Sequence, residues 1–242
     1  MILINNSPYN NGVYTILDKK KKLVIKSAFT KEGIQRVINE YSGYRWFLKR
    51  TNKNKLLKIK IKENKNYYAR FYGCLFPGNT ADFNASISDN YSNLLSVINF
   101  YKKIWPHNQK FLPIHGDFSL GNIIFYKNTI NIIDWEHFSI NKFPWGFDLL
   151  NMLYESIYFS IQGKKVLSKI DESNFINLYS LISNLIMKHN NINTYKSFSR
   201  FIKFNTINIW GDSVKKLPAI KFNYEQVNYI SDIEKYVINA SN

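Results

Sequence analysis

One segment in the middle of the chain constrains the fold more than any other, because it combines a strand hairpin with polar residues at the hairpin's open end. The apolar runs 123–127 and 129–133 lie on either side of Asn128, a residue type that tolerates the positive φ of a tight turn. Asn122 and Asp134 are equally distant from Asn128 along the chain. The hairpin therefore predicts that they face each other, with Cβ atoms about 4.5 to 5.5 Å apart.

An amide oxygen and a carboxylate at that separation form a hard, all-oxygen half-site. Magnesium accepts such a pair while keeping water and phosphate oxygens as its other ligands. Asp117 lies five residues before Asn122 on a loop that leads to the same end of the hairpin, so it can act beside a metal rather than bind it. Each residue alone has an ordinary explanation as a turn, cap or solvated strand end. The predicted register, which joins two of the three, favours a shared site.

These motifs resemble a known signature. His115-Gly116-Asp117, with Asn122 five residues after the aspartate and Asp134 in Ile-Asp-Trp-Glu, is similar to the catalytic loop and metal-binding sequence of the aminoglycoside phosphotransferase and choline kinase superfamily. Members of that superfamily share their fold with protein kinases. The resemblance implies an α+β, bilobal fold, with a small antiparallel-sheet N-lobe carrying one helix and a mostly helical C-lobe.

The resemblance also implies a reaction, an ATP- and magnesium-dependent phosphotransfer to a hydroxyl group. In this chain Asp117 would be the catalytic base and His115 would hold the catalytic loop, while Asn122 and Asp134 would be the metal ligands. Asp148, in Pro-Trp-Gly-Phe-Asp, matches an aspartate that braces the catalytic loop in the family.

The N-terminal part fits the same family more loosely. Val24-Ile25-Lys26 resembles the strand that presents a lysine to the α and β phosphates of the nucleotide, and Glu40 matches the glutamate that pairs with this lysine. Lys26 is also open to a plainer interpretation as one of many surface lysines. Glu40 is the only acidic residue between Gly33 and Lys62. A phosphate-covering loop with repeated glycines is missing, since only Gly12 precedes Lys26.

Hydrophobic periodicity divides the chain into a strand-rich part and a helix-rich part. The spacing predicts a hairpin at 13–17 and 23–28, a helix capped by Thr30 that runs to about Arg50, and strands at 56–62 and 67–73. After the break at 77–78, helices are expected over 91–105 and most of 146–242. We therefore expect a nucleotide-binding lobe over 1–75 and a catalytic and acceptor-binding helical lobe over 76–242.

The formal net charge of +16 is concentrated in the first third of the chain. Residues 1–75 hold 17 lysines and arginines against four acids, whereas residues 76–242 hold 16 against 13. In 57–62 lysine alternates with an apolar residue, which is typical of a strand with one buried and one solvated face. A surface for polyanions or weak contact with an anionic membrane is the alternative. No nucleic-acid recognition motif is present, so no specific nucleic-acid binding is expected.

Other classes of protein are disfavoured by composition. A single cysteine, Cys74, excludes an internal disulfide, and the four histidines show no zinc-binding spacing, so a reducing, cytoplasmic setting is expected. The apolar run at 2–4 is too short for a secretory signal, and no stretch approaches the ~18 apolar residues of a membrane span.

The acceptor is the least determined part of the predicted function. A neutral, aromatic and Asn-rich helical part favours a sugar or surface-glycan precursor. Choline or another amino alcohol would need an aromatic cage, for which Trp135, Trp145, Tyr154 and Trp210 are candidates. An aminoglycoside would need an acidic pocket, which the 13 acids of the second part make less favourable. A nucleotide-binding pseudokinase or interaction protein is the alternative from another class.

Overall fold

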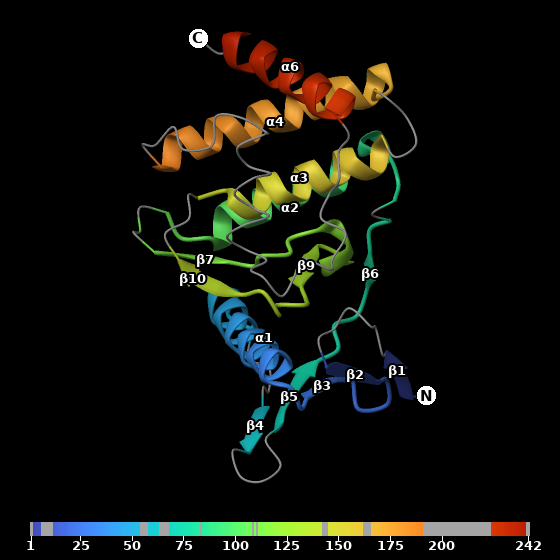
Figure 1. Ribbon diagram of the computed structural model, residues 1–242, viewed down its shortest axis with the longest axis vertical. Coiled ribbons are helices and arrows are strands. Elements are labelled where there is room, and N and C mark those ends of the chain that lie inside the picture. The colour runs from blue at the N-terminus through green and yellow to red at the C-terminus, as the bar shows by residue number, and fades with distance from the viewer. Residues whose placement is uncertain are drawn as a thin grey trace. The chain divides into compact units, whose positions relative to one another are not determined.

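The computed structural model describes residues 2–5, 12–53, 58–62, 68–82, 84–107, 109, 111–141, 145–161, 166–190 and 224–240 (Figure 1). The chain divides into two compact units, one of residues 1–79, 113–117 and 124–139, the other of residues 80–112, 118–123 and 140–242. This division differs from a single cut after residue 75, because the segments that carry Asp117 and Asp134 belong to the first unit.

A five-stranded antiparallel sheet forms the centre of the first unit, in the order β1-β2-β3-β5-β4. Its strands are β1 (Ile2–Asn5), β2 (Val13–Asp18), β3 (Leu23–Ala28), β4 (Lys58–Lys62) and β5 (Tyr68–Cys74). The predicted hairpin and the two later strands are confirmed. The pairing of β1 with β2 was not predicted, because four residues carry too little periodicity to identify a strand.

Helix α1 (Lys31–Arg50) packs on this sheet. It begins where expected, since the Thr30 hydroxyl accepts a hydrogen bond from the Gly33 amide at 3.1 Å. The buried side chains of α1 recur every three or four residues, and Tyr41 and Tyr44 contact Phe71 of β5 with ring centroids 6.5 and 5.4 Å apart. The prediction of one helix on a small sheet is therefore confirmed.

Short strands follow in the central part of the chain. The strands β6 (Asn79–Thr80), β8 (Ile123–Tyr126) and β9 (Thr129–Ile132) form one small sheet, and β7 (Leu112–Ile114) and β10 (Ser139–Asn141) form another. The 3-10 turn η1 (Leu120–Asn122) precedes β8.

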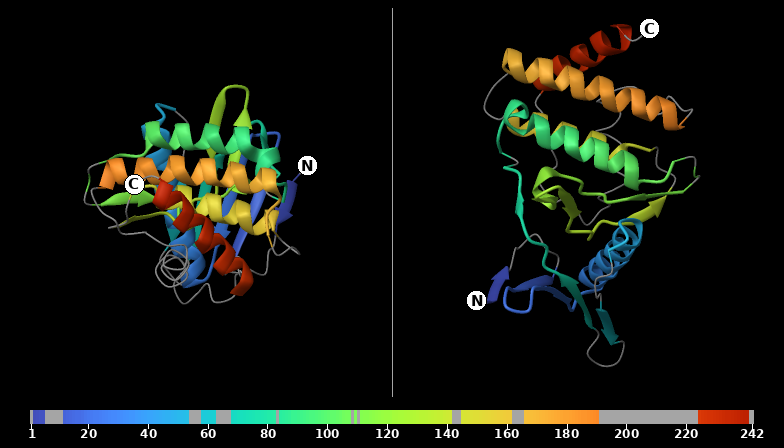
Figure 2. Two further views of the ribbon diagram at one scale, coloured as in Figure 1. Left: turned by 90° about the horizontal axis from the view of Figure 1, so that it is seen from above. Right: turned by 180° about the vertical axis from the view of Figure 1, so that it is seen from behind.

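Helices dominate the second unit. They are α2 (Ile87–Ile104), α3 (Phe147–Ser160), α4 (Lys169–Asn190) and α6 (Tyr224–Ala240). The helices α2, α3 and α4 contact one another and run side by side in both figures, and α6 contacts α4 (Figures 1 and 2). The helices α2 and α4 are amphipathic, with buried aromatic and aliphatic residues on one side, whereas α3 is buried along most of its length. No helix among the described residues is long and apolar enough to cross a bilayer.

Candidate nucleotide-binding and catalytic site

Lys26 is the centre of a buried cluster of charges in the first unit. It lies on β3, and because side chains alternate along a strand, it points to the face on which α1 packs. Its ammonium nitrogen lies 2.5 Å from Asp134 Oδ1, 2.8 Å from Glu136 Oε1 and 3.2 Å from Glu40 Oε2. The structure thus brings Lys26, Glu40 and Asp134 together, three of the residues that the sequence singled out. With 6% of its surface exposed, Lys26 is not an ordinary surface lysine.

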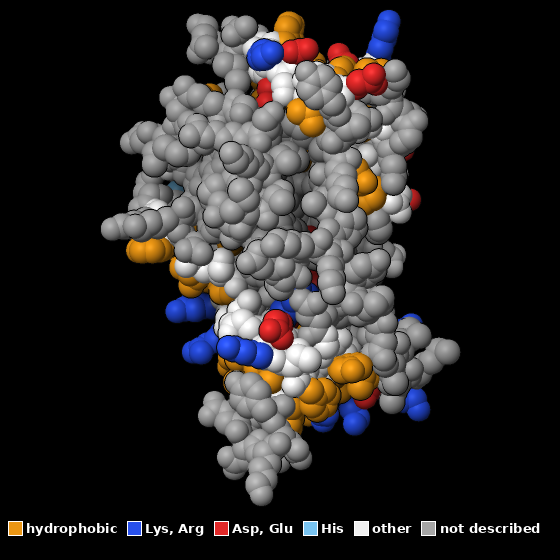
Figure 3. Space-filling view, viewed as in Figure 1, with side chains coloured by type: hydrophobic (Ala, Val, Ile, Leu, Met, Phe, Trp, Pro, Cys, Tyr) orange, Lys and Arg blue, Asp and Glu red, His pale blue; other side chains and the backbone are white. Residues whose placement is uncertain are grey.

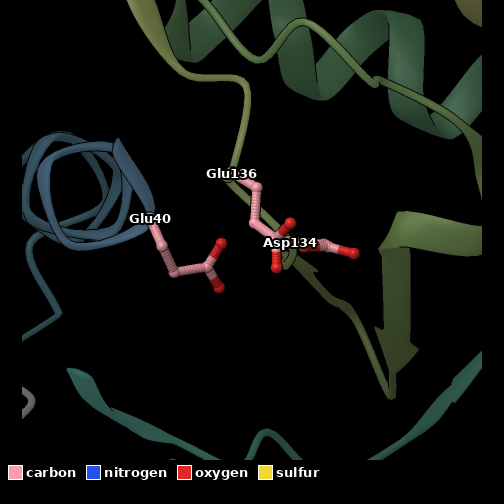
Figure 4. Close-up of side chains that lie close together, drawn as sticks. All are labelled: Glu40, Asp134 and Glu136. Carbon is pink, nitrogen blue, oxygen red and sulfur yellow. The ribbon is translucent and has the colours of Figure 1, made fainter. Parts of the chain in front are cut away.

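Three carboxylates converge on this one ammonium group. Figure 4 shows Glu40 pointing from α1 toward Asp134 and Glu136. Carboxylate oxygens of the three residues lie within 4.8 Å of one another. Such an all-oxygen set suits a hard divalent cation such as Mg²⁺, although Lys26 already provides positive charge among them. Asp134 is the carboxylate most open to solvent, with 43% of its side chain exposed, against 1% for Glu40 and 9% for Glu136.

Burial and charge shift the pKa values of the cluster in different directions. Burial raises the pKa of Glu40 to about 8, and Lys26 counteracts this only in part. Glu40 Oε2 accepts no hydrogen bond from the described residues, so its ion pair with Lys26 is its main compensation. Burial alone would lower the pKa of Lys26, but Asp134, Glu40 and Glu136 together hold it well above its ordinary value. Burial also opposes ionisation of Asp134, yet Lys26 keeps the pKa of this carboxyl below its usual range.

Glu136 is a member of the cluster to which the sequence assigned no role. Its second oxygen lies 3.4 Å from Arg36 Nη1, and its backbone carbonyl accepts a hydrogen bond from Asn39 Nδ2 at 3.1 Å. Arg36, Asn39 and Glu40 lie on one face of α1, because they are three and four residues apart. This spacing of polar residues on a buried helix face is the sequence signal that indicates a buried polar partner for α1, which in the structure is Glu136.

Trp135 attaches the same segment to α1 by packing. Its side chain is fully buried between Trp46 and Phe47, and its Nε1 donates a hydrogen bond to the Ile132 carbonyl at 3.0 Å. A Cβ atom at Gly43 would lie 2.6 Å from Trp135 Cβ. Glycine at this position in α1 therefore lets the indole approach the helix backbone. Asp134, just before Trp135, has a φ of 62°, an uncommon conformation that aspartate tolerates better than most residues.

His115 holds the loop that carries Asp117. Its Nδ1 accepts a hydrogen bond from the Asp117 amide at 3.3 Å, so Nε2 carries the proton and donates to the Ile133 carbonyl at 2.9 Å. Burial lowers the pKa of His115 to about 4, which keeps the ring neutral at pH 7. Gly116, between them, has a φ of 85°, and a Cβ there would lie 2.7 Å from the His137 carbonyl oxygen. These contacts link the Asp117 loop to the residue before Asp134.

The turn of the β8–β9 hairpin differs from the predicted turn. The strands leave a two-residue connection, Lys127 and Asn128, and it is Lys127 that has the positive φ, of 51°. The centre of the hairpin therefore lies between these two residues rather than at Asn128. Strand pairing does not reach Asn122 and Asp134, because Asn122 lies in η1 and Asp134 follows the end of β9. Their joint role in metal binding stays a prediction.

Asn122 and Asp148 belong to the second unit. Asp148 is fully buried in the first turn of α3. One turn further along the same helix, Asn151 Nδ2 donates to the Phe118 carbonyl at 3.3 Å, a contact with the segment after Asp117 that the sequence did not predict.

The aromatic residues considered for a choline cage are core residues where the structure describes them. Trp135, Trp145 and Tyr154 are each at most 1% exposed. The Tyr154 hydroxyl donates to Glu234 at 2.5 Å, within the helical unit. A cage must present ring faces to a ligand, so these three rings are not available in this form. Trp210 lies outside the described residues.

No protein-family model and no curated protein matches this sequence. Among solved structures, the chain is similar to the amicoumacin kinase hAmiN in complex with AMP-PNP, Ca²⁺ and Ami, at 8% identity and a TM-score of 0.52, with 99% of this chain and 88% of that chain covered. An ethanolamine kinase from Plasmodium vivax also matches, at 16% identity, a TM-score of 0.45 and coverage of 98% and 81%.

A choline kinase from Cryptosporidium parvum matches at 13% identity and a TM-score of 0.41, with 100% of this chain and 88% of that chain covered. The similarity to the amicoumacin kinase extends over nearly the whole chain, sheet and helices together. The chain therefore shares the α+β fold of that kinase structure, which agrees with the fold class that its motifs predicted.

Proposed function

We propose that this protein is an ATP- and magnesium-dependent phosphotransferase that phosphorylates a hydroxyl group of a small molecule. The observation that carries the proposal is the position of Lys26, buried on β3 and paired with Glu40 of α1 and Asp134. A lysine that served only to solvate the surface would stay in water and would not be buried among three carboxylates. Burial among them fixes the position of an ammonium group that binds phosphate oxygens.

Each residue has a role that follows from its chemistry. Lys26 would neutralise charge on the α and β phosphates, and Glu40 would fix its position. Asp134 and Asn122 would bind Mg²⁺, which supplies further positive charge to the phosphates when it is bound. Phosphoryl transfer asks a protein mainly for positioning and charge compensation, and these residues provide both.

Asp117 would accept or orient the proton of the attacking hydroxyl. Its place on the loop is fixed by the bond from its amide to His115 and by the tight turn at Gly116. His115 would then act through the loop rather than by proton transfer, because a buried, neutral imidazole that uses both nitrogens in hydrogen bonds has no free site for a substrate proton.

For the acceptor we propose a sugar or a surface-glycan precursor, with an amino alcohol or an aminoglycoside as the alternatives. The burial of Trp135, Trp145 and Tyr154 weighs against a cation cage built from these rings. A nucleotide-binding pseudokinase is the alternative from another class. The presence of Asp117, Asn122 and Asp134 favours turnover, since a domain without catalysis has no chemical need for all three.

The test is a transfer assay with labelled ATP, Mg²⁺ and a panel of acceptors that includes sugars, choline, ethanolamine, aminoglycosides and amicoumacin. Transfer to one class above the slow hydrolysis of ATP, lost in Asp117→Asn, would support a kinase and identify the acceptor class. Tight ATP binding without transfer to any acceptor would favour the pseudokinase. Failure to bind ATP at all would contradict both.

A further inference from the structure

One face of the β1–β5 sheet points away from α1. The helix α1 covers the opposite face through its contacts with Phe71. Side chains alternate along a strand, so Tyr68, Arg70 and Tyr72 of β5 point away from α1. By the strand register, Tyr14 and Lys60 lie on the same side. We call this surface, together with Phe29 just after β3, the outer sheet face.

Like charges face each other at the middle of the outer sheet face. Lys60 and Arg70 are directly opposed in the register of β4 and β5. Directly opposed like charges destabilise a sheet. The Arg70 guanidinium is held by a hydrogen bond from Nε to Ser27 Oγ at 3.0 Å, and neither cation forms an ion pair with any described residue. An anionic group placed between Lys60 and Arg70 would remove the repulsion.

Aromatic side chains lie beside this pair of cations. Phe29 and Tyr14 are 58% and 43% exposed, and Phe29 bridges Tyr14 and Tyr68 with ring centroids 6.1 and 6.2 Å apart. The Arg70 guanidinium lies over the Tyr68 ring at 5.8 Å. In Figure 3, hydrophobic and basic side chains lie next to each other in the region where Figure 1 labels β2, β3 and β5.

We propose that the outer sheet face docks on an anionic lipid bilayer, with headgroup phosphates between Lys60 and Arg70 and the rings of Phe29 and Tyr14 in the interfacial region. The excess of 17 basic over four acidic residues in 1–75 matches a negative surface. Lys26, one of the 17 basic residues, and Glu40, one of the four acids, are buried against each other, so neither contributes to this surface charge.

The ring geometry favours a bilayer over a single-stranded nucleic acid. Bases stack on open, parallel ring faces. Here Tyr14 and Phe29 meet at 64° and Phe29 and Tyr68 at 39°, so the three rings do not form a parallel stacking platform. Amphipathic rings beside cations are the combination found at membrane interfaces.

The experiment is co-sedimentation of the full chain with vesicles of pure phosphatidylcholine and of phosphatidylcholine with 30% phosphatidylserine, at low and at physiological salt. The wild type should bind the anionic vesicles and lose affinity as salt screens the charges. The Lys60→Gln/Arg70→Gln variant should bind roughly thirtyfold more weakly, as about 1 kcal/mol per basic residue near an anionic surface implies. Phe29→Ser should weaken the binding that remains at physiological salt.

The matched control is Lys102→Gln/Lys103→Gln, which removes the same charge from an exposed part of α2 in the other unit. It should retain binding within about threefold. All variants are checked for an unchanged melting temperature and for ATP binding, so that a misfolded sheet is recognised, and Arg70→Lys serves as a milder variant that keeps the charge.

Three results would overturn the proposal. The first is failure of the wild type to bind anionic vesicles at low salt. The second is an equal loss of affinity in the two double variants, which would indicate a general charge effect. The third is binding of a labelled single-stranded oligonucleotide through Lys60 and Arg70 without binding of the vesicles, which would assign the face to nucleic acid instead. None of these results bears on phosphotransfer, because the residues lie outside the proposed site.

Discussion

The ammonium nitrogen of Lys26 lies 2.5 Å from Asp134 Oδ1, although 108 positions separate the two residues in the chain. The contact joins the strand that would present the nucleotide-binding lysine to the segment that would bind the metal. Glu40 and Glu136 complete the surroundings of the same ammonium group. The three carboxylates of this cluster therefore depend on the same positive charge.

Removing the ammonium group should destabilise the fold as well as stop catalysis. In Lys26→Met three carboxylates remain close together with Arg36 as their main counter-charge, and loss of one partner from a buried pair costs about 3 to 5 kcal/mol. Urea unfolding should show this loss, and the assay should show no transfer. Lys26→Met/Glu40→Gln, with one carboxylate fewer, should regain part of the stability but no activity. Equal stability of Lys26→Met and the exposed control Lys102→Met would contradict the buried cluster.

Asp117→Asn should abolish transfer while ATP affinity changes by no more than a few fold. The reason is that a general base acts in the chemical step and not in nucleotide binding. Single-turnover kinetics and calorimetric titration with ATP measure the two effects separately. Asp232→Asn, at a position 72% exposed, is the control and should behave as the wild type. Parallel loss of binding and turnover in Asp117→Asn would instead mark a structural residue.

Asp134→Ala should remove the stabilisation that ATP with magnesium gives to the folded state. A ligand that binds only the native protein raises the melting temperature by mass action, and this linkage needs the metal site. Thermal unfolding with ATP alone, Mg²⁺ alone and both together measures the effect. The role assigned to Asp134 is wrong if both together raise the melting temperature of the variant and of the wild type by the same amount.

Protonation of His115 should lower the free energy of unfolding as the pH falls. Its folded-state pKa is about 4, below the ~6.5 of an unfolded histidine, so between these values the unfolded state binds the proton more readily. The free energy of unfolding should therefore fall as pH drops through this window, and the share of His115 between pH 7 and pH 5 is about 2 kcal/mol.

Urea unfolding of His115→Gln at pH 7, 6 and 5 tests this expectation. The variant should be less stable at pH 7, because it loses the bond to the Ile133 carbonyl, but its further loss by pH 5 should be about 2 kcal/mol smaller. His137, whose pKa burial also lowers to about 4, should add a dependence of the same sign, which His137→Gln isolates. An unchanged pH profile in His115→Gln would show that the ring is not held neutral.

Gly43→Ala should destabilise the first unit, even though alanine favours a helix by about 1 kcal/mol over glycine. The added Cβ would lie 2.6 Å from Trp135 Cβ and 2.7 Å from Cε3, and the indole is packed too tightly to move away freely. We expect a net loss of about 1 to 3 kcal/mol. In a double-mutant cycle with Trp135→Leu, the two losses should be less than additive. A gain in stability for Gly43→Ala would mean that the indole does not lie against the helix.

The sequence by itself determined the local elements and supplied the candidate residues for the site. The apolar runs of β2 and β3, the Thr30 cap of α1 and the spacing of His115, Asp117 and Asn122 are short-range patterns, and each depends on neighbours within a few residues. Together with the family resemblance, they sufficed for the fold class and for the pairing of Lys26 with Glu40, which lie 3.2 Å apart.

Only the tertiary structure decided what surrounds Lys26. Arg36 and Asn39 meet Glu136 across 100 and 97 positions of the chain, and no periodicity records such a contact. The contact between Trp135 and Gly43 was not predictable from the sequence either. The indole can lie against α1 only because Gly43 has no side chain, and this becomes evident only in the folded structure. The hairpin turn consists of residues 127 and 128 and is not centred on Asn128 as predicted. Several turns are compatible with the same pattern of apolar and polar residues, and packing selects among them. Local spacing thus specifies which groups are available, and long-range packing specifies which of them meet.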